Sequence, residues 1–410
     1  MNRLRQRRLR FGGGFSPLSL FAGGAEGAWF DPSDLTTLFQ DAAGTTPVTT
    51  SGQPVGLMFD KSKGLVLGPE LITNGTFPVN VAGWSTAGGL SGQVRDTIIF
   101  PSGGILITSN GSLGSFTSQT LTGLVVGQTY QVACNAYTPG TNAGTDTATI
   151  GTQNKSFTLQ GTALKPGRDV VQNLSIVFVA SGASQVIYLS VVSSDLLRWG
   201  NNGSESYFDN ISVRELPGNH ATQATGAARP TYTEGSGLAW LAFDGTGDAM
   251  ATGNIDFTGT EKINVFASVR KLSDAGVGMI AELATGTEFF MAGPQYVGQP
   301  DYSFRSTGSI GVEALISGFS APTTDVITGI GDIAGDSVSI RVNGALRTTN
   351  TGDQGSGNFS NSPIFIGARN QSSFFFTGNL YGFVARGALS TAAEIAATEA
   401  YLAAKSGVTL

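Results

Sequence analysis

Residues suited to acid–base or nucleophilic chemistry are scarce in this chain. Its 410 residues include one histidine, His220, and one cysteine, Cys134. A single histidine excludes zinc sites built from several histidines and argues against a Ser-His-Asp triad. Cys134 ends a segment with strand-like alternation, so we expect a buried core position rather than a nucleophile. With one cysteine, no disulfide can form within the chain, and its stability must come from apolar cores or from assembly.

The densest charge lies at the N-terminus, where five of the first ten residues are arginines and three glycines follow. We interpret this run as a docking arm, residues 1–24, that binds a protein partner through Arg3, Arg5, Arg7, Arg8 and Arg10. Three alternatives stay open: a disordered tail, a contact with nucleic acid, and a secretory or twin-arginine signal. Pro17 and Gly23 interrupt the apolar stretch that a signal would need.

The remaining composition describes a weakly charged, acidic chain. Charged residues make up 13%, against about 25% in ordinary globular proteins. The net charge of −6 gives no general affinity for nucleic acid, which we do not expect as a partner. No segment approaches the roughly 20 apolar residues of a membrane span. Such neutral, hydroxyl-rich surfaces are typical of secreted β-sandwiches, adhesins and virus particles.

Alternating apolar residues predict a mainly β fold with two tandem antiparallel β-sandwiches, of which the first has the strand spacing of a sandwich or jelly roll. One alternating set is Leu174, Ile176 and Phe178. We divide the chain into the basic docking arm (1–24), an anchor segment with a short helix (25–69), the jelly roll (70–216), a linker (217–235) and the second sandwich with a C-terminal helix (236–410).

The anchor segment carries the start signals of a helix. Asp31 suits the N-cap and Pro32 the first helical position. Leu35, Leu38 and Phe39 then form one apolar stripe. This pattern predicts a helix of two or three turns.

Two signals near the C-terminus are more specific. Asn343-Gly344 between alternating segments predicts a tight hairpin. Thr391 and Glu394 have the spacing of a capping box, and Gly407 marks the helix end. We therefore expect a C-terminal helix that covers a sheet edge or one end of the sandwich.

Three short motifs characterise residues 70–216: Glu-Leu-Ile-Thr-Asn-Gly-Thr-Phe at 70–77, Gly-Trp at 83–84, and Tyr-Phe-Asp-Asn-Ile-Ser-Val at 207–213. The region resembles the family-4/9-type carbohydrate-binding modules, which are β-jelly rolls. The resemblance implies that Asp209 helps to hold a structural Ca²⁺, because a carboxylate beside carbonyl oxygens suits a hard cation. The chain departs from the family at Pro78, where an acidic residue is common.

Glycan binding in such modules requires exposed aromatic rings with amides and hydroxyls around them. The available rings are Trp84, Trp199 and Tyr207. The resemblance implies that Trp84 belongs to the core, because the family packs an aromatic ring at this place after the first strand. Trp199 lies in a polar loop beside Asn201. The expected glycan-binding residues are therefore Trp199, Tyr207 and Asn201.

Residues 236–410 resemble laminin-G and concanavalin-like lectin sandwiches through Leu-Ala-Phe-Asp-Gly at 241–245, Ile-Arg-Val-Asn-Gly at 340–344 and Phe-Thr-Gly-Asn-Leu-Tyr-Gly at 376–382. This likeness predicts the fold and says nothing of the ligand. Retaining glycosidases need two carboxylates about 5–5.5 Å apart. Glu282 and Glu288 instead flank a Thr-Gly turn, so we expect no catalytic residues and no enzyme.

The combination of these parts over residues 28–410 is similar to tailed-bacteriophage structural proteins of the fibre or decoration kind. The resemblance implies a virion protein that docks to other virion proteins through residues 1–69, forms homo-oligomers such as a trimer, and projects its sandwiches toward host-surface glycans. A secreted or surface carbohydrate-binding protein of bacteria is the alternative. A polysaccharide depolymerase is the third hypothesis, weakened by the missing carboxylates.

Overall fold

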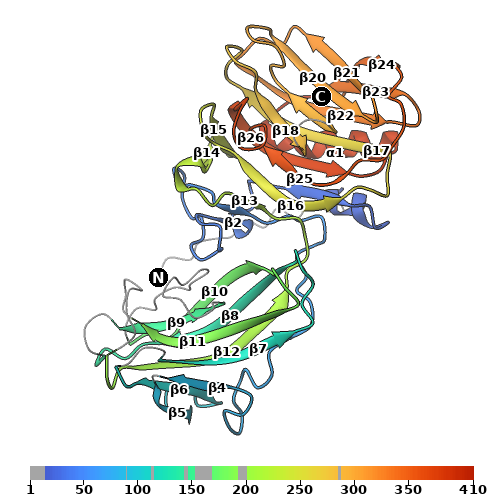
Figure 1. Ribbon diagram of the computed structural model, residues 1–410. Coiled ribbons are helices and arrows are strands. Elements are labelled where there is room, and N and C mark those ends of the chain that lie inside the picture. The colour runs from blue at the N-terminus through green and yellow to red at the C-terminus, as the bar shows by residue number, and fades with distance from the viewer. Residues whose placement is uncertain are drawn as a thin grey trace.

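The computed structural model describes residues 14–88, 90–111, 115–142, 146–152, 169–192, 201–284 and 288–410. Strands make up 47% and helical residues 7%, which confirms the mainly β prediction. Figure 1 shows two β-rich bodies, with residues 70–216 in the lower one and the C-terminal residues in the upper one. Within the described ranges, no helix is long and apolar enough to cross a membrane.

The lower body is a sandwich of two antiparallel sheets. Its described strands are β4 (Ser85–Gly88), β5 (Leu90–Asp96), β6 (Gly104–Ser109), β7 (Ser115–Thr122), β8 (Thr129–Tyr137), β9 (Thr147–Gly151), β10 (Gln172–Val179), β11 (Ser184–Val192) and β12 (Glu205–Glu215). One sheet has the order β10-β8-β12-β6-β5, and the other has the order β4-β7-β11-β9. The alternating residues Leu174 and Ile176 point into the core between the sheets, as do Trp84 and Cys134. The expected core positions of Trp84 and Cys134 are thus confirmed.

The upper body is a larger sandwich. Its strands after residue 230 are β14 (Thr231–Gly235), β15 (Leu238–Asp244), β16 (Met250–Asp256), β17 (Lys262–Lys271), β18 (Met279–Leu283), β19 (Phe289–Ala292), β20 (Asp301–Thr307), β21 (Gly311–Ser317), β22 (Thr323–Asp332), β23 (Ser337–Val342), β24 (Ala345–Asn350), β25 (Asn361–Ile366) and β26 (Thr377–Arg386). Asn343 (φ 51°) and Gly344 (φ 78°) form the predicted hairpin turn between β23 and β24.

The N-terminal segment is part of this upper sandwich. Its elements are η1 (Pro17–Phe21), β1 (Gly27–Phe30), η2 (Leu35–Thr37), β2 (Leu38–Phe39) and β3 (Leu57–Met58). Strand β1 pairs with β26, whereas β2 and β3 extend the order β2-β3-β13-β16-β25-β18-β19-β20-β21 of the second sheet. Leu20 and Phe21 are buried against Phe266 and Leu402. The boundary expected at residue 24 therefore falls inside a packed segment.

The helix predicted from Asp31 is a single 3-10 turn in the structure. Asp34, not Asp31, caps this turn by accepting a hydrogen bond from the Thr36 backbone N–H. Leu38 then enters strand β2 and is fully buried. Pairing of Leu38 with Met58 on β3 outweighs the local helix signals.

The segment predicted as a linker, 217–235, also consists of ordered elements. It contains the strands β13 (Ala221–Thr222) and β14 and, between them, the 3-10 turn η3 (Gly226–Ala228). Strands β13 and β14 belong to different sheets of the upper sandwich. His220 is buried there, and its Nδ1 accepts a hydrogen bond of 2.9 Å from the backbone N–H of Asp60. Nε2 faces the Leu216 carbonyl oxygen at 3.2 Å.

The C-terminal helix α1 (Ala392–Ser406) confirms the predicted capping box. Thr391 accepts from the Glu394 backbone N–H, and the Glu394 side chain accepts from the Thr391 backbone N–H. Gly407 ends the helix in a left-handed conformation. The helix contacts β17, β22 and β26. Together with η1, it covers the outer face of their sheet through a cluster that includes Leu402.

Candidate glycan-binding face

An aromatic pair lies on the outer face of the five-stranded sheet of the jelly roll. Tyr207 on β12 pairs with Tyr137 on β8 and with Leu106 on β6. The neighbours of Tyr207 along the strand, Ser206 and Phe208, are buried, so Tyr207 faces outward. The two tyrosine rings meet edge to face, with centroids 5.7 Å apart and planes at 79°. We call the surface around Tyr137, Tyr207 and Leu106 the tyrosine face.

Each phenol of the tyrosine face is oriented by a carboxylate. Tyr207 donates a hydrogen bond of 2.7 Å to Glu205 Oε2, and Tyr137 donates one of 3.0 Å to Asp169 Oδ1. Asp169 also accepts from the Gly140 backbone N–H at 2.7 Å. Burial raises the pKa of both phenols, and the hydrogen bonds to the carboxylates raise these pKa values further. Both tyrosines therefore stay protonated near neutral pH, and their rings are held in place.

The end of β12 that bears Tyr207 is tied to neighbouring loops. Asn142 and Glu205 exchange two hydrogen bonds, from Asn142 Nδ2 to the Glu205 carbonyl at 2.7 Å and from the Glu205 backbone N–H to Asn142 Oδ1 at 2.8 Å. The backbone N–H of Asn201 donates to Asp146, which also accepts from Ser204 Oγ at 2.8 Å. Asn201 thus lies in a fixed loop that leads into the strand of Tyr207.

Of the other site residues expected from the sequence, six fall outside the described part of the chain. These are Trp199 and the docking-arm residues Arg3, Arg5, Arg7, Arg8 and Arg10. Tyr137, Glu205 and Asp169 were not expected as site residues. One sequence signal for Tyr137 exists, because it continues the outward positions Gln131, Ala133 and Asn135 of its strand.

Asp209 lies two residues beyond Tyr207 and is buried. Its strand neighbour Phe208 pairs with Ile105, and the residue before Ile105, Gly104, pairs with Asp96. Burial raises the pKa of Asp209, and the nearby charge of Asp96 raises it further. The two carboxylates thus repel each other across β6, which is an arrangement that a bound cation would relieve.

The donor set around Asp209 fits calcium only in part. Asp96 already accepts hydrogen bonds from the backbone N–H groups of Ile98, Ile99 and Phe100. In the described ranges, no group of three or more His, Cys, Asp and Glu side chains has a metal-binding arrangement. Ca²⁺ takes 6–8 oxygen ligands, so backbone carbonyls and water would have to supply most of them beside Asp209.

Comparisons with known proteins assign the chain to no family. No family model and no curated protein matches the chain. Among solved structures, the chain is similar to the binding domain of botulinum neurotoxin serotype G, with 10% identity and a TM-score of 0.34 over 42% of this chain and 44% of that chain. The receptor-binding domain of the C/D mosaic serotype gives 10% identity and a TM-score of 0.33 over 44% and 50%. The chain spans half or less of these structures, and we draw no functional argument from likeness at this level.

Proposed function

We propose that the protein is a non-enzymatic structural protein that binds glycans through the tyrosine face. The observation that carries this proposal is the outward pair Tyr137 and Tyr207, held by Asp169 and Glu205. A sugar ring has an apolar C–H face and a rim of hydroxyl groups. A half-buried phenol ring on the outer face, with carboxylates beside it, matches both parts.

The tyrosine face would bind a sugar without reacting with it. The Tyr207 ring provides the stacking surface, and the Tyr137 ring packs beside it at a steep angle. The free lone pairs of the Glu205 carboxylate accept hydrogen bonds from sugar hydroxyls. Trp199 and Asn201, which precede this strand, are proposed to extend the same site.

We further propose that the particle to which the protein belongs is a tailed-phage virion, with host-surface glycans as the ligands and a homo-oligomer as the assembled form. Residues 14–69 pack against the upper sandwich and are part of its fold. The segment available for docking is therefore shorter than residues 1–69. The arginines of residues 1–13 are the proposed contact with other virion proteins. A secreted carbohydrate-binding protein would share the tyrosine face, but its N-terminal signal would be removed. N-terminal sequencing of the mature protein would distinguish the two.

The test of glycan binding is a double variant, Tyr137→Ala with Tyr207→Ala, measured on a glycan array and on host-surface polysaccharide. We expect the affinity to fall about tenfold or more, which corresponds to about 1.4 kcal/mol. Tyr188→Ala is the matched control, because Tyr188 packs edge to face on Phe116 in the other sheet of the same sandwich. Equal binding by the double variant and the wild type would refute the role of the tyrosine face.

A further inference from the structure

A cleft of about 580 Å³ lies between the two sandwiches. One wall comes from the jelly roll and includes Val126, Phe178 and Val179. The opposite wall comes from β16 and β25 of the upper sandwich, and His220 of the connecting segment lines the cleft as well. Figure 1 shows β16 at the side of the upper body that faces β10 of the lower one. We call this space the interdomain cleft.

Direct contacts between the two sandwiches hold the walls of the interdomain cleft at a fixed distance from each other. The backbone N–H of Val177, at the end of β10, donates a hydrogen bond of 2.8 Å to the Ala43 carbonyl of the N-terminal segment. The side chain of Val177 packs with Leu57, Phe59 and Leu216 in an apolar cluster that joins the sandwiches. These contacts fix the spacing of the walls before any ligand arrives, so little ordering is required on binding.

The two walls have different chemistry. On the jelly-roll side, Val126 and Val179 are 64% and 58% exposed, whereas the Phe178 ring packs against the jelly-roll core and stacks on Tyr130. On the opposite side, the exposed residues Asn254 and Asp256 lie on β16, and Asp256 pairs with Asn361 of β25. A register shift between Ala251 and Asn254 brings Gly253 and Asn254 to the surface together. An apolar wall therefore faces a wall of amides and one carboxylate.

The charge of the interdomain cleft disfavours anions. No lysine or arginine is among the residues that line it, whereas Asp256 is. His220 adds no positive charge, because its Nδ1 accepts the Asp60 backbone N–H and so carries no proton. Burial lowers the pKa of His220, which keeps the ring neutral. A ligand that fits both walls is small, carries no negative charge, and is apolar on one side.

We propose that the interdomain cleft binds one or two pyranose rings of a neutral saccharide. The C–H face of the sugar lies against Val126 and Val179, and its hydroxyls bond to Asn254, Asp256 and Asn361. The volume falls within the roughly 300–1,000 Å³ of small-molecule sites. The cleft shares no residue with the tyrosine face, so this proposal stands or fails independently of the one above.

Gly253 offers a variant that fills the cleft. A Cβ at this position would have no atom within 4 Å, and the backbone φ is not in the left-handed region. Gly253→Trp therefore places a ring in the cleft without displacing core residues. Gly259→Trp is the matched control, because Gly259 is equally open and does not line the cleft. Asn361→Ala is a second variant, which shortens an exposed side chain. Its result does not depend on whether the bulge around Gly253 accepts a large residue.

The experiment is calorimetry on the full chain with cellobiose, lactose and N,N′-diacetylchitobiose at up to about 10 mM, which covers millimolar dissociation constants. We expect at least one of these sugars to bind and to slow hydrogen exchange in residues 177–179 and 252–256. Gly253→Trp and Asn361→Ala should each weaken that binding about tenfold or more. Gly259→Trp and the double tyrosine variant should retain it. The proposal is overturned if none of the three sugars binds, if Gly253→Trp and Asn361→Ala bind like the wild type, or if the double tyrosine variant abolishes binding.

Discussion

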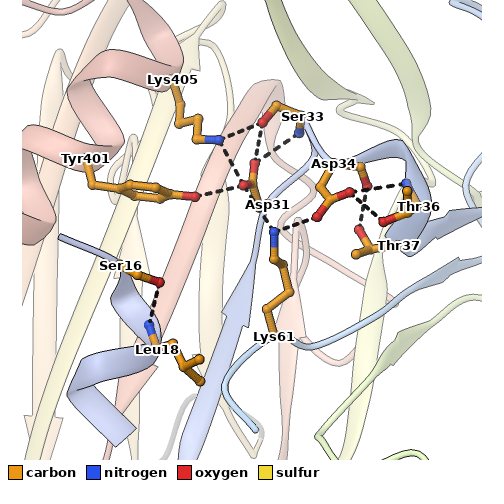
Figure 2. Close-up of polar contacts among 10 residues, drawn as sticks. All are labelled: Ser16, Leu18, Asp31, Ser33, Asp34, Thr36, Thr37, Lys61, Tyr401 and Lys405. Atoms are coloured by element: carbon orange, nitrogen blue, oxygen red, sulfur yellow. Dashed lines mark hydrogen bonds and ion pairs between the residues drawn. The ribbon is translucent and has the colours of Figure 1, made fainter. Parts of the chain in front are cut away.

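The phenol of Tyr401 donates a hydrogen bond of 2.7 Å to Asp31 Oδ2, although the two residues are 370 positions apart. Figure 2 shows that Lys405 Nζ reaches the same carboxylate, at 2.8 Å. Burial by itself would raise the pKa of Asp31, but Lys405, Ser33 and Lys61 outweigh it and hold that pKa at about 2. The carboxylate therefore fastens the N-terminal segment to helix α1.

Loss of this carboxylate should destabilise the upper sandwich. We expect Asp31→Ala to lower the free energy of unfolding by about 3 kcal/mol, because Lys405 loses its partner in a mostly buried position. Glu26→Ala is the control, since the pair of Glu26 with Lys63 is exposed and worth less than about 1 kcal/mol. Chemical denaturation of both variants provides the measurement. Similar losses in the two variants would mean that Asp31 contributes no more than a surface pair.

The contribution of Asp31 should also depend on pH. Its folded-state pKa of about 2 lies below the value of 3.8 taken for the unfolded chain. Stabilisation is therefore complete above about pH 4 and is lost as the pH falls toward 2. Melting temperatures of the wild type and Asp31→Asn should converge over this window. A constant difference between the two curves down to about pH 2 would argue against this linkage.

Ionisation of Asp248 should lower the stability of the folded protein, whereas ionisation of Asp31 raises it. Burial and the neighbouring charge of Asp244 raise the pKa of Asp248 to about 6. The folded state thus binds a proton more tightly than the unfolded chain, and stability should decrease as the pH rises from about 4 to about 6. Asp248→Asn keeps an acceptor for the Asp244 backbone N–H, which donates to Asp248 at 3.0 Å. We expect this variant to be about 1 kcal/mol more stable than the wild type near neutral pH, a value reduced for solvent screening.

Asp244→Asn is the contrasting variant. Burial opposes ionisation of Asp244, but hydrogen bonds from Thr246, Gly247 and Asp248 hold its pKa at about 2. Its charge is therefore stabilising, and we expect Asp244→Asn to lower the melting temperature near neutral pH. If both variants shifted the melting temperature in the same direction, the assignment of the two carboxylates would be wrong.

Local sequence patterns predicted those elements whose cause is local. The capping box of Thr391 and Glu394 and the turn at Asn343-Gly344 depend on residues within one turn of each other, and both are present. The conformation of the chain around Asp31 depends instead on Tyr401 and on the pairing of β1 with β26. Its cap-like surroundings therefore predicted a helix where long-range pairing forms a strand and a 3-10 turn.

Local sequence patterns predict the tyrosine face only in part, for the same reason. A ring in a recognisable motif indicated Tyr207, but only the register between β8 and β12 shows that Tyr137 is its neighbour. The hydrogen bond between Tyr137 and Asp169 likewise joins the end of β8 to a residue 32 positions further along the chain. Sequence alone indicated Tyr207 and Asn201 and left Tyr137, Glu205 and Asp169 of the proposed face unassigned.

Calcium binding near Asp209 remains a proposal with a direct test. A metal bound only to the folded state stabilises it by about 2.7 kcal/mol at a hundredfold excess over its Kd. Chelator should then lower the melting temperature of the jelly roll, and Asp209→Asn should remove that sensitivity. Magnesium in place of calcium is the control for general ionic effects. A melting curve unmoved by chelator would mean that Asp209 is only a hydrogen-bond acceptor for the Asn210 backbone N–H.

The two jelly-roll tryptophans should respond differently to truncation. Trp84 is 6% exposed, packs on Phe77 and donates from Nε1 to the Asn74 carbonyl at 3.3 Å. Trp84→Ala should cost about 3–5 kcal/mol of stability, as core aromatic truncations do. Trp199→Ala should weaken polysaccharide binding and leave the melting temperature nearly unchanged. A destabilised Trp199→Ala protein beside a neutral Trp84→Ala protein would reverse the assignment of core and site.

Stepwise truncation of the N-terminus separates docking from folding. Removal of residues 1–13 should leave a folded protein that no longer joins its particle, because the arginines proposed to dock are lost. Removal of residues 1–24 should in addition destabilise the upper sandwich, because Leu20 and Phe21 leave the cluster around Phe266 and Leu402. Apolar truncations of this size cost about 2–5 kcal/mol per side chain. Thermal melting and the copy number in purified particles give the two readouts. Incorporation of the shorter truncation at normal copy number would refute docking through the arginines, and an unchanged melting temperature for the longer one would refute the packing role of η1.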